Sequence, residues 1–180
     1  MKNVNRKFTD TEIRVNCTAA FPSLFTPKAP KDGNGKPKYE LCVVVDKSDD
    51  QAVELVNAAV EAAKALYTEQ FGKPKGKLKT WVSDGDEERP DDPFFAGKLY
   101  FTAKADRKPE LKIVENGMLV DPLDETEIYG GCRGGALVRF YPYNNAGGSG
   151  IACGLNGFVK LEDGPRMGGG ASANAFDDLV

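Results

Sequence analysis

The stretch Gly134-Gly-Ala-Leu-Val-Arg-Phe-Tyr-Pro-Tyr143 alternates between two kinds of side chain along its length. One face of an extended chain carries small and apolar groups and the other carries larger, mostly polar or aromatic ones: Ala136, Val138 and Phe140 against Leu137, Arg139, Tyr141 and Tyr143. A period of two is typical of a β-strand with one face on a core and the other in solvent. The sequence therefore predicts a half-buried strand here.

Similar patterns recur on both sides of this stretch. Strict alternation is found at Glu12–Ala20 and Lys98–Lys104, and β-forming runs at Tyr39–Val45, Lys112–Val114 and Ile151–Leu161. Only one long segment has helical spacing. It follows a capping-box pattern, Ser48 to Gln51, carries Val53, Val56, Val60, Ala63 and Tyr67, and ends near Gly72. Several short strands and one helix predict a mainly β fold, a β-barrel with one main helix.

Three connecting segments are expected to be exposed. Phe21–Lys38 is rich in proline, glycine and lysine and predicts a long loop. A second loop, from Trp81 to Pro93, is acidic, and a glycine-rich turn follows at Asn144–Gly150. These segments predict a barrel with elaborated loops.

Charge is unevenly distributed along the 180 residues. The total is −3, but Asp84–Asp92 carries −5 and the final five residues carry −2. The rest of the chain is therefore basic, at +4. Local charge, more than the total, decides which partners a surface attracts.

Composition excludes several classes of protein and site. The four cysteines contain no Cys-x-x-Cys pair and the chain has no histidine, so neither a zinc site nor a histidine-based catalyst is expected. No run approaches the roughly 20 apolar residues of a membrane span. The polar segment Met1–Asp10 lacks the apolar core of a secretory signal. We expect a cytoplasmic protein with reduced thiols and without cofactor or metal.

The polar faces of two strands offer a chemistry for nucleic acid. Tyr100 and Lys104 share one face, and Arg139, Tyr141 and Tyr143 share another. Single strands are bound by aromatic rings that stack on bases and by cations that follow the phosphates. The alternative is that tyrosine occurs there only as a good strand former.

Two acidic patterns raise the alternative of a metal site. Asp84-Gly-Asp86 could hold a cation, although it lacks the remaining ligands of a calcium loop. Asp91, Glu110 and Lys112 are similar to the spaced acids and lysine of a magnesium-dependent nuclease. A solvated turn and a short accidental match are the competing interpretations.

The end of the chain differs from the rest. We divide the chain into a folded domain, residues 1–165, and a flexible glycine-rich linker with an acidic tip, residues 166–180. The tip mixes acids with apolar groups, and we expect it to dock on partner proteins: Phe176, Asp177, Asp178, Leu179 and Val180. A frayed terminus is the competing interpretation.

Five segments together resemble a tailed-phage family of single-stranded DNA-binding proteins with an oligonucleotide-binding (OB) fold. They are Tyr39-Glu-Leu-Cys-Val-Val-Val-Asp-Lys-Ser, Asp84-Gly-Asp, Ile128-Tyr-Gly-Gly-Cys-Arg, Phe140-Tyr-Pro-Tyr-Asn and Gly150-Ile-Ala-Cys-Gly-Leu-Asn. The resemblance extends from about Glu12 to the tip. A simple OB barrel has its helix between the third and fourth strands, whereas here the helix follows the second visible strand. Either one strand is hidden or the topology is elaborated.

The resemblance implies a binder of single-stranded DNA in phage replication or recombination, working in the infected bacterial cell, and not an enzyme. We expect sequence-independent binding between the Lys28–Lys38 loop and the Tyr143–Gly150 turn. The expected DNA-binding residues are Lys38, Trp81, Tyr100, Lys104, Arg133, Arg139, Tyr141 and Tyr143. A magnesium-dependent nuclease and a phage structural or adaptor protein remain the alternatives, and a homo-oligomer is left open.

Overall fold

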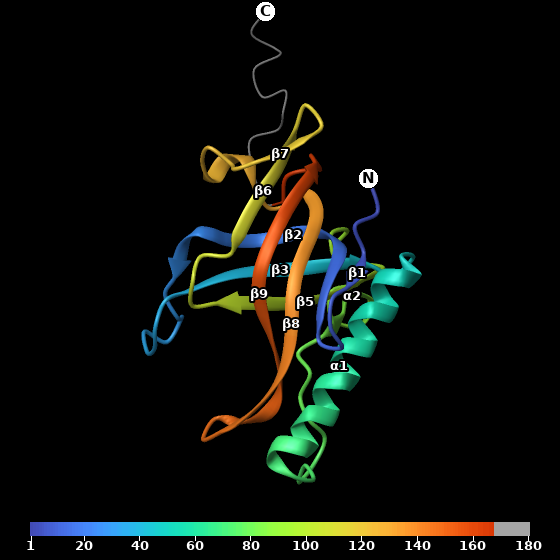
Figure 1. Ribbon diagram of the computed structural model, residues 1–180, viewed down its shortest axis with the longest axis vertical. Helices are drawn as coiled ribbons and strands as arrows, with labels where there is room; N and C mark the ends of the chain where they lie inside the picture. Colours follow the sequence, from blue (N-terminus) through green and yellow to red (C-terminus); the bar gives the residue numbers. More distant parts are fainter. Residues whose placement is uncertain (168–180) are drawn as a thin grey trace, which may run out of the picture.

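A computed structural model describes residues 1–167 of the protein. Five strands form a closed barrel, with one long helix against it (Figure 1). The barrel strands are β2 (Glu12–Lys28), β3 (Lys38–Asp46), β5 (Lys98–Ala105), β8 (Arg133–Asn145) and β9 (Gly148–Glu162). The predicted mainly β fold with one main helix is confirmed.

The strands are connected as in an OB barrel. β2 pairs with β3, β3 with β5, β8 with β9 and β8 with β2, all antiparallel. A parallel pairing of β5 with β9, where Lys104 lies opposite Gly154, closes the barrel. This closure, with β4 paired to β5 and β6 paired to β9, covers part of the two remaining strand edges and so limits pairing with other chains.

The other elements are short. They are β1 (Arg6–Lys7), β4 (Ser83–Asp84), α2 (Gly85–Glu88), β6 (Glu110–Glu115), β7 (Met118–Val120) and the 3-10 turn η1 (Glu125–Glu127). β4 extends the sheet beside the first half of β5, and β6 runs parallel to β9 with β7 as its hairpin partner. The β6–β7 hairpin occupies the connection between the third and fourth barrel strands, where a simple OB barrel has its helix.

Alternation along the strands produces the core. The inward side chains of all five barrel strands are buried, and the rings of Phe101 and Phe140 lie 5.2 Å apart between centroids. Burial of such side chains contributes about 1.5–3 kcal/mol each. Other members of the core include Ile13, Val15, Leu41, Val43, Val138, Ile151 and Phe158. The period-of-two prediction for residues 134–143 is therefore confirmed within β8.

The helix α1 (Asp50–Phe71) packs on the barrel through an apolar face of small and medium side chains, with Ala52, Val56, Ala59, Val60, Ala63 and Tyr67 buried. Its N-cap is Asp49, whose carboxylate accepts the backbone N–H of Ala52 at 3.0 Å. Ser48, which the capping-box pattern indicated, instead donates its hydroxyl to Asp46. α1 lies between the second and third barrel strands. The only strand before α1 that the sequence did not indicate is the two-residue β1, which is not part of the barrel, so the topology is elaborated.

The structure corrects all three expected loops. The turn expected at Asn144–Gly150 is reduced to residues 146–147, because β8 runs to Asn145 and β9 begins at Gly148. The segment Phe21–Lys28 belongs to β2, because the strand continues past a break in register after Ala20, and the true loop is residues 29–37. The acidic segment after Trp81 contains β4 and α2, so it is partly regular.

A second apolar cluster lies outside the barrel. Ala20, Cys42, Val44 and Phe95 are buried together, with Phe94, Tyr100 and Met167 against them. Cys42 and Val44 alternate with the core residues of β3 and so point away from the barrel interior. Burial raises the pKa of the Cys42 thiol to about 11. The segment 89–97 is thus fixed over the outer face of β3 and β5.

All four cysteines are buried and have free thiols. Cys17, Cys42, Cys132 and Cys153 form no disulfide. Within residues 1–167, no helix is long and apolar enough to cross a membrane.

Candidate nucleic-acid interface

Register places four residues in one row across the outside of the barrel. Arg139 on β8 lies opposite Gly154 on β9, Gly154 lies opposite Lys104 on β5, and Lys104 lies opposite Glu40 on β3. Gly154 lies between Arg139 and Lys104 in this row and has no side chain, so β9 places no side chain between them. Two predicted phosphate contacts, Arg139 and Lys104, are brought together here.

Tyr141 borders this row. Its β9 partner is Ala152, and its ring lies 3.7 Å from the position that a Cβ at Gly154 would occupy. The residue is 39% exposed, and burial of the rest raises the pKa of its phenol. A ring supported by two small residues and open to solvent is able to stack on a base.

Trp81 lies beside the β8–β9 hairpin. Its indole Nε1 donates to the Tyr143 hydroxyl at 3.0 Å, and the Lys79 ammonium lies 3.3 Å from the centre of its ring. The side chain is 54% exposed, and its φ of 59° is unusual for a bulky residue. Gly150 is needed here, because a Cβ would lie 2.4 Å from the Lys79 carbonyl oxygen. We call Trp81, Tyr141 and Tyr143 the aromatic patch.

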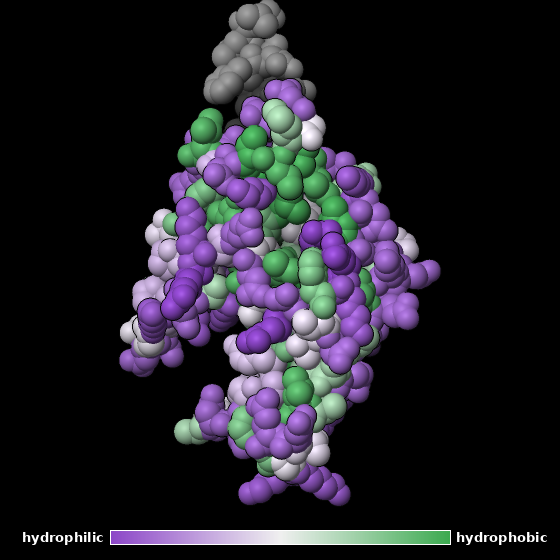
Figure 2. All heavy atoms as spheres, viewed as in Figure 1, coloured by the Kyte–Doolittle hydropathy of each residue, from purple (hydrophilic) through white to green (hydrophobic). Residues whose placement is uncertain are grey.

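A groove rich in lysine lies next to this patch. It runs between the 29–37 loop and the outer face of β3 and β5, and its cationic members are Lys28, Lys31, Lys36, Lys38 and Lys104. We call it the lysine groove. Glu40 is shared between Lys28 at 2.9 Å and Lys104 at 3.9 Å, so it neutralises only part of the charge. Figure 2 shows a hollow between the 29–37 loop and the β8–β9 hairpin, whose places are given in Figure 1.

The groove continues toward an arginine and a phenylalanine that the sequence did not indicate. Phe21 is 55% exposed and stacks on Phe95 with ring centroids 6.2 Å apart. The Arg89 guanidinium lies 4.5 Å from the centroid of the Phe95 ring. Phe21 and Arg89 line the same hollow as Lys28, Lys31 and Thr102. In the sequence, Phe21 falls in a segment rich in proline, glycine and lysine and Arg89 in an acidic one, so no local pattern marks either residue as part of a site.

Two predicted contacts lie apart from the patch and the groove. Tyr100 packs edge-on against Phe95 at 4.8 Å and donates to Glu88 at 2.9 Å, so its ring belongs to the packing beneath Arg89. Burial raises the pKa of its phenol.

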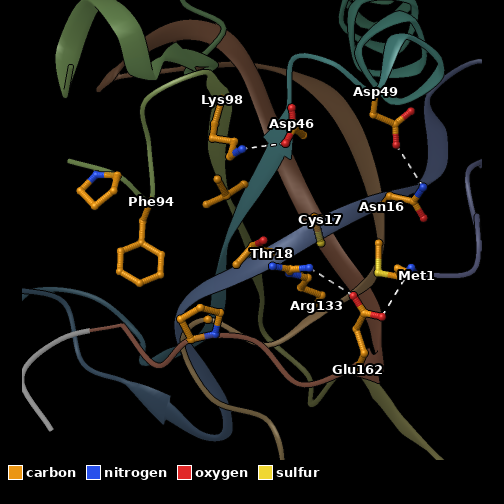
Figure 3. A pocket seen from close by; sticks show the side chains of 14 residues that line it. Met1, Asn16, Cys17, Thr18, Asp46, Asp49, Phe94, Lys98, Arg133 and Glu162 are labelled. Atoms are coloured by element: carbon orange, nitrogen blue, oxygen red, sulfur yellow. Dashed lines mark hydrogen bonds and ion pairs between the residues drawn. The ribbon is translucent and has the colours of Figure 1, made fainter. Parts of the chain in front are cut away.

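Arg133 lies at the opposite end of β8 from Tyr141. Its guanidinium is 3.3 Å from Glu162, which also contacts the N-terminal amine (Figure 3). Contacts of Tyr100 and Arg133 with DNA stay predictions without geometric support, whereas Lys38, Trp81, Lys104, Arg139, Tyr141 and Tyr143 lie on or beside the patch and the groove.

The acidic segment has a structural role. Lys47 pairs with Asp84 and, at 2.8 Å, with Asp86, and these hydrogen bonds lower the pKa of both carboxyl groups. Asp86 also accepts the backbone N–H of Gly97 at 2.7 Å, which ties both ends of the segment together. Within residues 1–167, no group of three or more potential ligands is arranged to hold a metal ion. Lys112, from the nuclease-like pattern, is paired with Asp121 at 2.6 Å.

A family model described as "Enterobacter phage Enc34, ssDNA-binding protein" matches residues 11–179. The chain belongs to this family. The match covers nearly the whole chain, so the resemblance seen in the five sequence segments is confirmed. No curated protein matches the sequence.

Solved structures of single-stranded DNA-binding proteins from two phages have the same fold. The single-stranded DNA-binding protein from bacteriophage Enc34 in complex with ssDNA is 24% identical, with a TM-score of 0.76 over 93% of this chain and 99% of that one. Its C-terminal truncation gives 24% identity and a TM-score of 0.72, over 93% and 98% of the two chains. The single-stranded DNA-binding protein gp2.5 of bacteriophage T7 is 17% identical, with a TM-score of 0.61 over 96% of each chain.

Proposed function

We propose that this protein binds single-stranded DNA across the aromatic patch and along the lysine groove. The observation that carries the proposal is that the aromatic patch and the lysine groove meet at Gly154. This glycine lies under the Tyr141 ring and opposite Lys104. Stacking surfaces and phosphate-binding cations are therefore adjacent, as single-strand binding requires. Family membership supports the same function.

Binding of this kind is independent of sequence. Every base has a π-face for Trp81, Tyr141 and Tyr143, and the lysines contact a backbone that all strands share. The protein would cover and protect single strands during phage DNA replication or recombination, in the cytoplasm of the infected cell. No catalytic step is needed for this role.

Neutralising lysines in the groove is expected to weaken the dependence of affinity on salt. Each phosphate contact contributes a slope of about −0.7 in a plot of log K against log salt for single strands. Lys38→Gln and Lys104→Gln should each reduce the slope by about that amount. Fluorescence titrations of oligo-dT at several salt concentrations measure it. Lys7→Gln, which removes an exposed lysine paired with Asp10, is the control and should leave the slope unchanged. Unchanged slopes in both groove variants would remove the phosphate part of the proposal.

We further propose that the C-terminal tip recruits replication or recombination proteins. The support is its sequence, because Phe176–Val180 lies outside the residues that the structure describes. Arg166 and Met167 still contact the folded domain, at the Tyr129 ring and the Gly130 carbonyl in the segment before β8. The domain boundary at residue 165 stays a prediction.

Deleting Phe176–Val180 is expected to keep or raise the affinity for single-stranded DNA and to abolish partner binding. Two carboxylates that repel phosphate are lost, while the patch and the groove remain. Oligo-dT titration measures the DNA affinity, and pull-down from infected cells measures partner binding. Asp177→Asn/Asp178→Asn is a milder variant for both measurements. Weaker DNA binding after deletion would contradict this assignment.

A further inference from the structure

The β6–β7 end of the molecule exposes apolar side chains among acids. Met118 and Leu119 are each 64% exposed, and Leu123 is 91% exposed. The segment 115–127 has five acids and no basic residue: Glu115, Asp121, Asp124, Glu125 and Glu127. Figure 2 shows apolar side chains gathered at this end. We call residues 114–127 the acidic end.

Within residues 1–167, no other element of the fold covers this end. β7 is the last strand in the sheet order of the described residues, so one of its edges pairs with nothing. Exposed apolar groups rimmed by charge and next to a free strand edge mark sites of protein association. Its negative charge makes it unsuitable for contact with DNA phosphates.

The opposite end of the molecule is basic. α1 ends at Phe71, and residues 71–79 contain four lysines and no acid. Phe71 is 43% exposed, so this end also offers an apolar contact. Figure 1 shows the C-terminal end of α1 and the β6–β7 hairpin at opposite ends of the long axis. We call Phe71, Lys73, Lys75 and Lys77 the basic end.

We propose that the acidic end of one protomer docks on the basic end of a second copy of this chain. Opposite charge and exposed apolar groups on both surfaces make them complementary. A contact between two different surfaces is heterologous, and because these two surfaces lie at opposite ends of the long axis, we expect it to build an open row of protomers and not a small ring. Such a row would form along one DNA strand, so the inference rests on the proposed binding of single-stranded DNA.

Two charge-reversed variants test the contact. Asp124→Lys/Glu125→Lys changes the acidic end, and Lys73→Glu/Lys75→Glu changes the basic end, with none of these residues in the patch or the groove. Binding is measured to an oligo-dT of about 10 nucleotides, within the range for one OB fold, and to one of about 60 nucleotides, which holds several protomers. Each variant should bind the long strand roughly tenfold or more weakly per protomer, with lost cooperativity and unchanged affinity for the short strand.

A chain that carries all four substitutions provides the decisive variant. Its substituted positions, 124 and 125 on one end and 73 and 75 on the other, again carry opposite charges, so cooperative binding to the long strand should return. Leu119→Ser/Leu123→Ser tests the apolar part and should also reduce cooperativity. Both side chains are largely exposed, so we expect this variant to fold, and circular dichroism checks that it does. Cooperativity that persists in both charge-reversed variants, or no rescue in the combined one, overturns the inference.

Failure of the inference and failure of the proposed function give different results. Loss of short-strand affinity in Lys73→Glu/Lys75→Glu would make the basic end a DNA contact and would overturn the docking. Absence of wild-type binding to either strand would instead overturn the proposed function. Capture of a different protein by the acidic end, with cooperativity intact, would also count against a second copy as its partner.

Discussion

Replacing both Trp81 and Tyr141 by alanine is expected to weaken binding of oligo-dT by roughly 30-fold or more. A base stacked on an aromatic ring contributes about 1–3 kcal/mol by alanine substitution, and about 1.4 kcal/mol corresponds to a factor of ten in affinity. Both rings are substantially exposed, so their removal leaves no large cavity in the core. Titrations of the variant against oligo-dT at fixed salt measure the loss.

Two single variants separate stacking from other effects. Tyr141→Phe keeps the ring and should bind as the wild type does. Tyr143→Phe removes the hydroxyl that accepts the Trp81 indole N–H at 3.0 Å, so it should cost part of the affinity by releasing Trp81. A double alanine variant that folds normally and binds oligo-dT with wild-type affinity would show that the DNA lies elsewhere.

Gly85→Ala is expected to destabilise the protein by about 3 kcal/mol or more, at the upper end of what overpacking costs. A Cβ at this position would lie 1.7 Å from the carbonyl oxygen of Phe95, which is backbone and has little room to move. Phe95 supports Phe21, Tyr100 and Arg89, so the damage would extend to one wall of the groove. In a chain of this size, each 1 kcal/mol lowers Tm by about 2–4 °C.

Thermal unfolding by circular dichroism tests this expectation. Gly76→Ala is the matched control, because a Cβ there meets no atom within 4 Å. We expect its Tm to stay close to that of the wild type. A Gly85→Ala protein with unchanged Tm would mean that the segment 85–97 is not fixed to the barrel as described.

The barrel strands were predictable because the period of two is a local property. Val138 and Phe140 face the core in β8, and Arg139 and Tyr141 face outward, as their alternation indicates. The helix was predictable for the same reason, but its cap was displaced by one residue. Asp49 provides the stronger cap because Asn5 and Asn16 also bond to its carboxylate. Those partners are far away in sequence.

The site was predictable only in part, because most of its geometry depends on distant contacts. Trp81 and Tyr143 are 62 residues apart, and no local pattern joins them. The outward position of Tyr100 on β5 was evident, but the folding of residues 89–97 over it was not. Arg133 is a cation on a barrel strand, as a phosphate contact would be, but its guanidinium is paired with Glu162, which is distant in the sequence. Phe21 and Arg89 enter the site through a strand continuation and a covering segment that composition concealed.

The fluorescence of Trp81 provides the most direct test of where DNA binds. It is the only tryptophan in the chain, so emission excited selectively from tryptophan reports on the aromatic patch alone. Titration with oligo-dT should quench this emission to saturation at low salt, and added salt should reverse the quenching as phosphate contacts are lost. Binding detected by labelled DNA while Trp81 emission stays unchanged would contradict the proposed interface.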